Sequence, residues 1–226
     1  MRIAVNIKIK ICGITNLADA AGTVDAGADA IGLNFYRGSM RFVNIGDART
    51  IANAVGRRAK IVGVFVDAPV DEIRSVGDEV ALDFIQLHGN EPPEVLQQLE
   101  ENCGIVRARR LDERGPRAIR DDLADCRRLC GFAPDAILID AAAAGQFGGT
   151  GQTVDWQQLA DHESWLPGVP LILAGGLTPD NVAEAIRIVR PSAVDVASGV
   201  ESEPGKKDVA KVRDFVAAAR AAFAAL

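Results

Sequence analysis

Short apolar runs rich in Val, Ile and Leu alternate along the chain with longer segments in which apolar residues recur at helical spacing. Eight of these runs have the length and β-branched content of strands that are buried on both faces. Their spacing fits repeated units of one strand, one helix and two short loops. The predicted strands are Asn6–Cys12, Asp29–Phe35, Lys60–Val66, Asp83–Leu87, Ile105–Arg109, Ala136–Asp140, Pro170–Ala174 and Ala193–Ala197.

The segments between the predicted strands carry signals for helix starts and ends. A helix is predicted over Asn16–Ala26, with Thr15 or Asn16 as its cap, and Asp47 predicts the start of a helix over Asp47–Val55 that stops before Gly56. Polar and apolar residues between Arg114 and Leu129 follow no clean period. Further helices are predicted over Pro92–Glu101, after Asn181, and over Lys206–Ala224.

Eight strand–helix units in 226 residues predict a single-domain (β/α)₈ TIM barrel over residues 1–226, with a short N-terminal extension within residues 1–9. An open doubly wound sheet is the alternative, but such sheets commonly have five or six strands and a Gly-rich first turn. The turn after the first predicted strand reads Cys12-Gly13-Ile14-Thr15-Asn16 and has no GxGxxG motif. The sequence also has no GxxxxGK[ST] motif. The barrel is therefore favoured.

Charge and cysteine content narrow the classes of partner. The chain has 31 acidic against 25 basic residues, and its formal charge of −6 argues against nucleic acid or an anionic membrane as the main partner. The sequence has no apolar run long enough for a membrane span and no visible secretory signal. Four cysteines without CxxC spacing, beside two histidines, predict free thiols in a reducing cytoplasm and no structural metal. The sequence leaves the oligomeric state open.

Two ionisable side chains end predicted strands, where the active site of a barrel lies. Cys12 ends the first strand, and Lys8 and Lys10 share its face, so we expect an ammonium to lower the pKa of the thiol. Asp140 ends the sixth strand after four apolar residues, and partial burial is expected to raise its pKa, which suits a general acid. The alternatives are a buried, inert cysteine and a carboxylate that caps a helix or forms a salt bridge.

Small residues follow the last two predicted strands. Gly175 and Gly176 come after the seventh strand, and Ser198 and Gly199 come after the eighth, with a short extra helix expected near Val200. Barrels use loops at these two positions to present backbone N–H groups to a phosphate. Glycines that serve only as turns are the alternative. We interpret the paired loops as a binding site for a phosphorylated small molecule.

Further candidate binding groups lie near the same end of the predicted barrel. Arg41 follows the second strand and is suited to bidentate binding of a carboxylate, although a surface salt bridge is an equal alternative. His88 follows the fourth strand and is a second candidate for substrate binding. The segment 141–153 contains four glycines and is expected to cover a ligand or to approach it closely.

As an ordered set, these positions resemble the phosphoribosylanthranilate isomerase family of tryptophan biosynthesis. The resemblance spans residues 10 to about 215, and each segment alone is weak evidence. The matching segments are Lys10–Thr15, Gly27–Gly32, Asn34–Tyr36 with Ser39 and Arg41, Gly63–Val66, Gln86–Gly89, Leu138–Asp140, Gly148–Gly151 with Asp155 and Trp156, Ala174–Leu177, Val194–Glu201 and Pro204–Asp208.

The resemblance implies an isomerase that converts N-(5-phosphoribosyl)anthranilate into 1-(2-carboxyphenylamino)-1-deoxyribulose 5-phosphate by an Amadori rearrangement. It implies Cys12 as general base, Asp140 as general acid, Arg41 at the anthranilate carboxylate and the glycine loops at the phosphate, with no cofactor or metal. Two features depart from the family. Arg37 and Met40 stand in a loop where the family often has prolines, and residues 112–130 match poorly.

Two other functions stay open at this point. Another enzyme acting on a sugar phosphate would fit the same barrel, although the epimerases among them usually need metal-binding histidines, which are scarce here. A non-catalytic barrel that binds a phosphorylated metabolite would fit the glycine loops. Loss of the acid or the base would indicate such a protein, and this chain has both Cys12 and Asp140.

Overall fold

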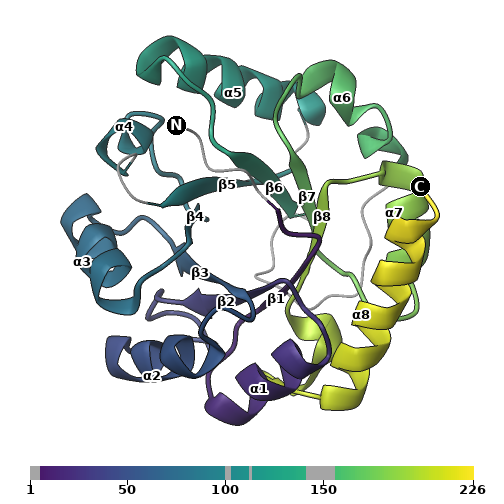
Figure 1. Ribbon diagram of the computed structural model, residues 1–226. Helices are drawn as coiled ribbons and strands as arrows, with labels where there is room; N and C mark the ends of the chain where they lie inside the picture. Colours follow the sequence, from purple (N-terminus) through teal and green to yellow (C-terminus); the bar gives the residue numbers. More distant parts are fainter. Residues whose placement is uncertain (1–5, 100–102, 112–113, 141–155) are drawn as a thin grey trace.

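Eight parallel strands close into a barrel in the computed structural model, which describes residues 6–99, 103–111, 114–140 and 156–226. The strands follow one another in chain order, and the last pairs with the first (Figure 1). All eight predicted strands are confirmed, with small differences at their ends. They are β1 (Ile9–Cys12), β2 (Ala30–Asn34), β3 (Lys60–Phe65), β4 (Phe84–Leu87), β5 (Gly104–Arg110), β6 (Ala136–Asp140), β7 (Leu171–Ala174) and β8 (Ala193–Val196).

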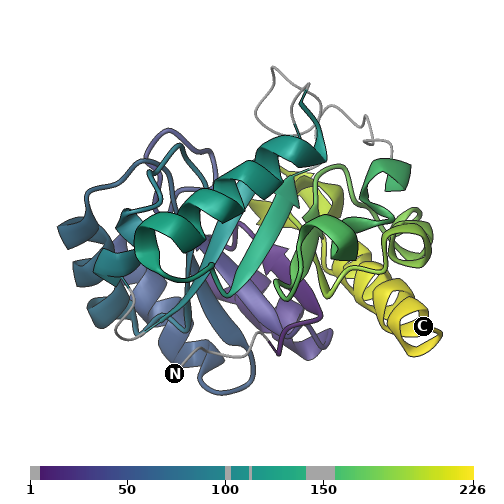
Figure 2. The same ribbon diagram turned by 90° about the horizontal axis from the view of Figure 1, so that it is seen from above.

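Helices surround the strands and lie along the outside of the barrel (Figures 1 and 2). They are α1 (Leu17–Asp25), α2 (Ile45–Val55), α3 (Val70–Val80), α4 (Val95–Leu99), α5 (Pro116–Cys130), α6 (His162–Trp165), α7 (Val182–Val189) and α8 (Val209–Ala224). Shorter elements complete the fold: the 3₁₀ turns η1 (Trp156–Leu159) and η2 (Ser198–Val200), and a small hairpin of β9 (Glu201–Glu203) and β10 (Lys206–Lys207). In the described part of the chain, no helix is long and apolar enough to cross a membrane.

Capping side chains explain where the helices begin. Asn16 accepts a hydrogen bond from the backbone of Asp19, which confirms the predicted start of α1. The prediction that Asp47 opens α2 is wrong, because Asn44 caps that helix. The last helix begins only after Asp208, which accepts hydrogen bonds from two backbone N–H groups of the first turn. The residues before Asp208 pair with β9 instead of continuing the helix.

Helix α5 forms in the segment that shows no clean period in the sequence. Its buried residues are Ile119, Leu123, Cys126 and Cys130, which recur every three or four positions and so line one narrow face. Charged residues fill most of the other positions of the helix and obscure that stripe. The helix ends at Gly131, whose left-handed backbone, with φ of 81°, suits a glycine.

The strands bury their two faces in different environments. Side chains on the outer face, such as Ile9, Ile11 and Leu33, pack against the helices in the larger core cluster. The inner face holds a smaller cluster that fills the barrel. That cluster comprises Ile7, Ala30, Val62, Phe84, Val106, Ala108, Ala136, Leu138, Ile172, Ala174 and Ala193.

A buried arginine ties β5 to α5 on the outer face of the barrel. Arg107 is 1% exposed, and its guanidinium binds the carboxylate of Asp122 in a bidentate manner, at 2.8 and 3.0 Å. Arg109 binds the same carboxylate at 3.0 Å. Burial alone would raise the pKa of Asp122, but the two guanidinium groups outweigh it and hold that pKa below its usual value.

We predict that Asp122→Ala lowers the free energy of unfolding by about 3–5 kcal/mol, because it leaves a buried guanidinium without its carboxylate. Since the pKa of Asp122 is depressed in the folded state, its contribution is present above the unfolded-state pKa of about 3.9 and is lost as the pH falls through the lower folded value. Urea unfolding at pH 7 measures the loss.

The matched control is Asp121→Ala, at the neighbouring position of α5, where the side chain is exposed. This control should change the free energy of unfolding by less than about 0.5 kcal/mol. Equal losses in the two variants would show that the Arg107–Asp122 pair is not the source of the effect.

Candidate active site

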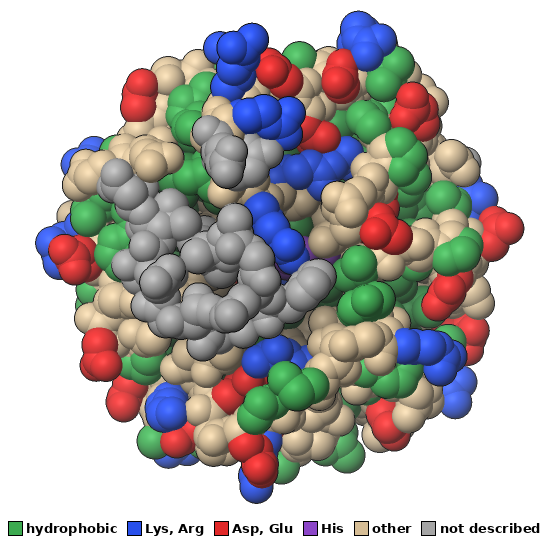
Figure 3. Space-filling view, turned by 180° about the vertical axis from the view of Figure 1, so that it is seen from behind, with side chains coloured by type: hydrophobic (Ala, Val, Ile, Leu, Met, Phe, Trp, Pro, Cys, Tyr) green, Lys and Arg blue, Asp and Glu red, His purple; other side chains and the backbone are tan. Residues whose placement is uncertain are grey.

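The strands bring three of the predicted site residues to one end of the barrel. Cys12 and Asp140 are the last residues of β1 and β6, and His88 directly follows β4. Because side chains alternate along a strand, Asp140 shares the inner face with Leu138 of the barrel interior. His88 Nε2 lies 3.9 Å from Asp140 Oδ2. Figure 3 shows this end of the molecule, where Lys and Arg side chains gather near the centre.

A buried ion pair lies directly beneath Cys12. Lys10 and Asp195 are register partners on β1 and β8, and Lys10 Nζ lies 2.9 Å from Asp195 Oδ2. Both side chains are buried. Gly32, the register partner of Cys12 on β2, leaves the space for this arrangement, because a Cβ there would meet the sulfur of Cys12 at 2.7 Å and Lys10 Cε at 3.2 Å.

The expectation that an ammonium brings the pKa of Cys12 below its ordinary value is wrong. Burial raises the pKa of the Cys12 thiol, Lys10 lowers it and Asp195 raises it, and the result lies above the ordinary value. Burial alone would lower the pKa of the Lys10 ammonium. The attraction of Asp195 and Cys12 outweighs burial, so the pKa lies above its ordinary value and Lys10 stays charged. Lys8 is exposed and lies over the ring of Phe223, away from this ion pair.

Arg41 holds a carboxylate of the protein itself. Its Nε and Nη2 donate to the two oxygens of Glu201 at 2.8 and 2.6 Å, and Lys207 Nζ donates to Glu201 at 2.8 Å. Burial would raise the pKa of Glu201, but the hydrogen bonds from Arg41 and Lys207 bring it below the usual value. The structure therefore shows the salt bridge that the sequence left as the alternative for Arg41, here with a buried carboxylate. The binding of a substrate carboxylate by Arg41 stays a prediction.

The loops after β7 and β8 meet above the barrel. Gly175 and Gly176 have φ of 86° and 65°, a region that favours glycine. A Cβ at Gly199 would overlap the carbonyl oxygen of Leu177, so only glycine lets the two loops approach this closely. Asn181 stabilises the loop after β7 by donating a hydrogen bond to the carbonyl oxygen of Gly176 at 2.9 Å. The predicted short helix at Ser198–Val200 is present as η2. The phosphate itself stays a prediction.

Three buried polar residues of this end were missed by sequence reasoning. Asp195, Gln86 and Glu201 are all less than 9% exposed. The signal for Asp195 was a carboxylate inside the short apolar run of β8, and for Gln86 an amide inside the apolar run of β4. The Gly-rich segment 141–153 lies outside the described residues. Among those that are described, no group of three His, Cys, Asp or Glu side chains is placed to hold a metal ion.

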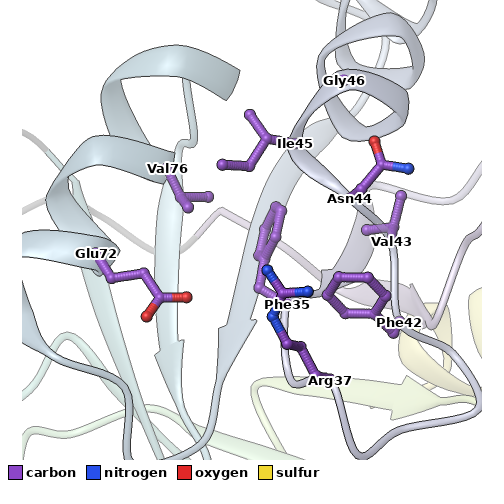
Figure 4. A pocket seen from close by; sticks show the side chains of 9 residues that line it. All are labelled: Phe35, Arg37, Phe42, Val43, Asn44, Ile45, Gly46, Glu72 and Val76. Carbon is purple, nitrogen blue, oxygen red and sulfur yellow. The ribbon is translucent and has the colours of Figure 1, made fainter.

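A pocket of about 310 Å³ lies elsewhere, on the outside of the barrel beside α2 and α3 (Figure 4). Its walls are mostly apolar, and the guanidinium of Arg37 lies 5.5 Å from the ring of Phe42. The pocket contains none of the predicted site residues. Its lining residues are Phe35, Arg37, Phe42, Val43, Asn44, Ile45, Gly46, Glu72 and Val76.

The closed barrel and the groups at its C-terminal end define a class: a (β/α)₈-barrel protein with a thiol, a carboxyl and paired glycine loops at the catalytic face. The family model for N-(5′-phosphoribosyl)anthranilate (PRA) isomerase matches residues 9–218. N-(5′-phosphoribosyl)anthranilate isomerase of Magnetococcus marinus is 47% identical, over 96% of each chain. The enzyme of that name from Myxococcus xanthus is 43% identical, over 95% of this chain and 97% of its own.

Solved structures agree with the sequence matches. Phosphoribosyl anthranilate isomerase from Thermotoga maritima superposes with a TM-score of 0.82 at 38% identity, covering 95% of this chain and 99% of that one. A second solved structure of a phosphoribosyl anthranilate isomerase is 36% identical and superposes with a TM-score of 0.79, with the same coverage of both chains. It is a complex with reduced 1-(o-carboxyphenylamino)-1-deoxyribulose 5-phosphate. The chain belongs to the N-(5′-phosphoribosyl)anthranilate isomerase family. Its function is that of an isomerase in tryptophan biosynthesis.

We predict that Lys10→Met raises the pKa of Cys12 further, because it removes the ammonium that opposes burial. Asp195→Asn should act in the opposite direction, because Asp195 raises the same pKa. The rate of Cys12 alkylation by iodoacetamide, followed by peptide mass spectrometry over a pH series, measures both changes. Shifts of the same sign in the two variants would contradict this account of the charges around Cys12.

Proposed function

We propose that Cys12 is the general base and Asp140 the general acid in the isomerisation of N-(5′-phosphoribosyl)anthranilate. The observation that carries the proposal is their placement. The two side chains end different strands on the inner face of one barrel. The Lys10 ammonium lies beside Cys12, and the His88 ring lies near Asp140. A substrate lying across the mouth would therefore meet one proton acceptor and one proton donor.

The chemistry needs both groups in turn. Asp140 gives its proton to the furanose ring oxygen as the C1–O bond breaks, which leaves an open chain with a protonated imine. The Cys12 thiolate then removes the proton from C2, and the electron pair of that bond forms the enolamine. Tautomerisation of the enolamine to the ketone completes the rearrangement. The base and the acid act on different atoms, so they must stand apart.

The raised pKa of Cys12 has a consequence for this scheme. The thiol is mostly protonated at neutral pH, and the active thiolate forms beside the Lys10 ammonium, which stays charged. A thiolate of higher pKa is a stronger base toward carbon, at the cost of a smaller ionised fraction. The support for Cys12 as base is therefore the ammonium at its side, which limits the effect of burial.

Substrate binding uses the other groups of the mouth. We assign the carboxylate of the anthranilate ring to Arg41 and the phosphate to the loops of Gly175, Gly176, Ser198 and Gly199. The positive charge that remains where Arg41 and Lys207 share Glu201 supports the first assignment, and the contact between the two glycine loops supports the second. A phosphorylated small molecule is then the ligand of this site.

An isotope experiment separates the acid from the base. Cys12→Ser should lower turnover by about 10²–10⁴ and expose a large isotope effect for substrate deuterated at C2, because proton removal from carbon becomes limiting. Asp140→Asn should lower turnover by a similar factor but reduce the isotope effect toward unity, because ring opening becomes limiting. Stopped-flow fluorescence of freshly made substrate measures both.

Binding of a product analogue is the control, since both variants keep the glycine loops and should change its affinity little. If Asp140→Asn showed the large isotope effect and Cys12→Ser none, the two roles would have to be exchanged. Turnover near the wild-type value in both variants would overturn the proposal.

We predict that Arg41→Ala weakens binding of reduced 1-(o-carboxyphenylamino)-1-deoxyribulose 5-phosphate, a product analogue. The expected loss is roughly 1.5–3 kcal/mol, the usual range for a hydrogen bond to a charged group. The matched ligand is an analogue without the carboxylate, which should lose little affinity. Isothermal titration calorimetry gives both values. Equal losses for the two ligands would place Arg41 outside the carboxylate site and leave it as the partner of Glu201 alone.

A further inference from the structure

A buried amide lies beneath His88 on the inner face of β4. Gln86 is 1% exposed, and its Nε2 lies 2.8 Å from His88 Nδ1. Phe84, two residues earlier, belongs to the apolar cluster inside the barrel, so Phe84, Gln86 and His88 form one inward row. On its other side the imidazole ring points Nε2 at Asp140 Oδ2, at 3.9 Å. The ring therefore stands between an amide and the proposed general acid.

The amide decides which ring nitrogen carries the hydrogen. Gln86 Nε2 is a donor, so His88 Nδ1 is an acceptor, and the neutral ring must carry its hydrogen on Nε2. The opposite amide orientation would require a hydrogen on Nδ1 and would direct the lone pair of His88 Nε2 at the Asp140 carboxyl. That lone pair could stabilise only the protonated carboxyl, whereas a hydrogen on Nε2 can stabilise the carboxylate that forms when Asp140 gives up its proton.

We propose that His88 is a positioning residue for Asp140, held by Gln86 in the tautomer that directs an Nε2–H at the carboxylate. The inference rests on the proposed role of Asp140 and deepens it. When Asp140 gives its proton to the substrate, negative charge develops on its oxygens. The Nε2–H of His88 is one donor that faces this charge, and it stabilises the carboxylate by a hydrogen bond rather than by proton transfer.

The distance fits a contact that strengthens during the reaction. At 3.9 Å His88 Nε2 and Asp140 Oδ2 do not form a hydrogen bond with each other. A shift of about 1 Å would bring them to hydrogen-bond distance once the carboxylate forms. An interaction that is stronger in the transition state than in the ground state raises turnover without tightening substrate binding.

The first experiment reads the tautomers directly by ¹⁵N NMR of uniformly labelled protein without ligand, at a pH where both rings are neutral. The chain has two histidines, and the other provides an internal control. His162 Nδ1 lies 3.1 Å from the carbonyl oxygen of Leu159, which only accepts, so His162 must carry its hydrogen on Nδ1. His88 should show the opposite tautomer, and His88→Gln identifies its signals.

Gln86→Met tests whether the amide of Gln86 selects the tautomer of His88, since it keeps the side-chain volume and removes the donor. We expect the His88 signals in this variant to move toward a mixture of tautomers while those of His162 stay unchanged. A hydrogen on Nδ1 of His88 in the wild-type protein, or unchanged His88 signals in Gln86→Met, would overturn the role of Gln86. This measurement involves no catalysis, so it stands even if Asp140 proves not to be the acid.

The second experiment compares two replacements of His88. Gln can present an amide donor near the position of Nε2, whereas Met cannot donate. We expect His88→Met to lower kcat by about 10- to 100-fold with little change in KM, and His88→Gln to recover most of that loss. Equal losses in both variants, or a loss confined to KM, would overturn the positioning role. Activity retained in Asp140→Asn would instead overturn the proposed acid.

Discussion

The buried ion pair between Lys10 and Asp195 sets the constraint on which this end of the barrel depends. It lies at the seam where the last strand meets the first, and the register places the two residues side by side. Two charges taken out of water are stable only when they remain paired, so neither side chain can move far without cost. Cys12 lies two residues after Lys10 on the same face of β1, so the pair fixes the charges beside the thiol.

The proposed acid at the same end of the barrel is supported in a different way. Lys10 and Asp195 place full charges beneath the thiol, whereas Gln86 places a neutral amide beneath His88, which faces Asp140. A thiolate needs a compensating charge because burial raises its pKa. Gln86 adds no charge beside His88 and Asp140, and orients the ring by a single contact. The two supports therefore match the opposite proton-transfer tasks we propose for the strands above them.

The sequence predicted the strands well because each is a buried apolar run with its own local signal. It failed where the information is non-local. The acidic partner of Lys10 is decided by the register of β1 against β8, and no local pattern relates those segments. The pKa of Cys12 failed for a related reason, since the alternation that put Lys10 beneath the thiol said nothing of how deeply both are buried. Helix α5 was obscured because charged residues cover most of its surface.

The proposed binding of a substrate anion at Arg41 depends on the charges around that side chain. A guanidinium already bound to Glu201 would be a poor partner for a substrate carboxylate if the pair were alone, because its charge would be cancelled. Lys207 also binds Glu201, at 2.8 Å, so two cations share one carboxylate and the cluster keeps one positive charge. The depressed pKa of Glu201 keeps that carboxylate ionised, which holds Arg41 in place. The site thus gains both a fixed guanidinium and a net attraction that the charge of the whole chain does not provide.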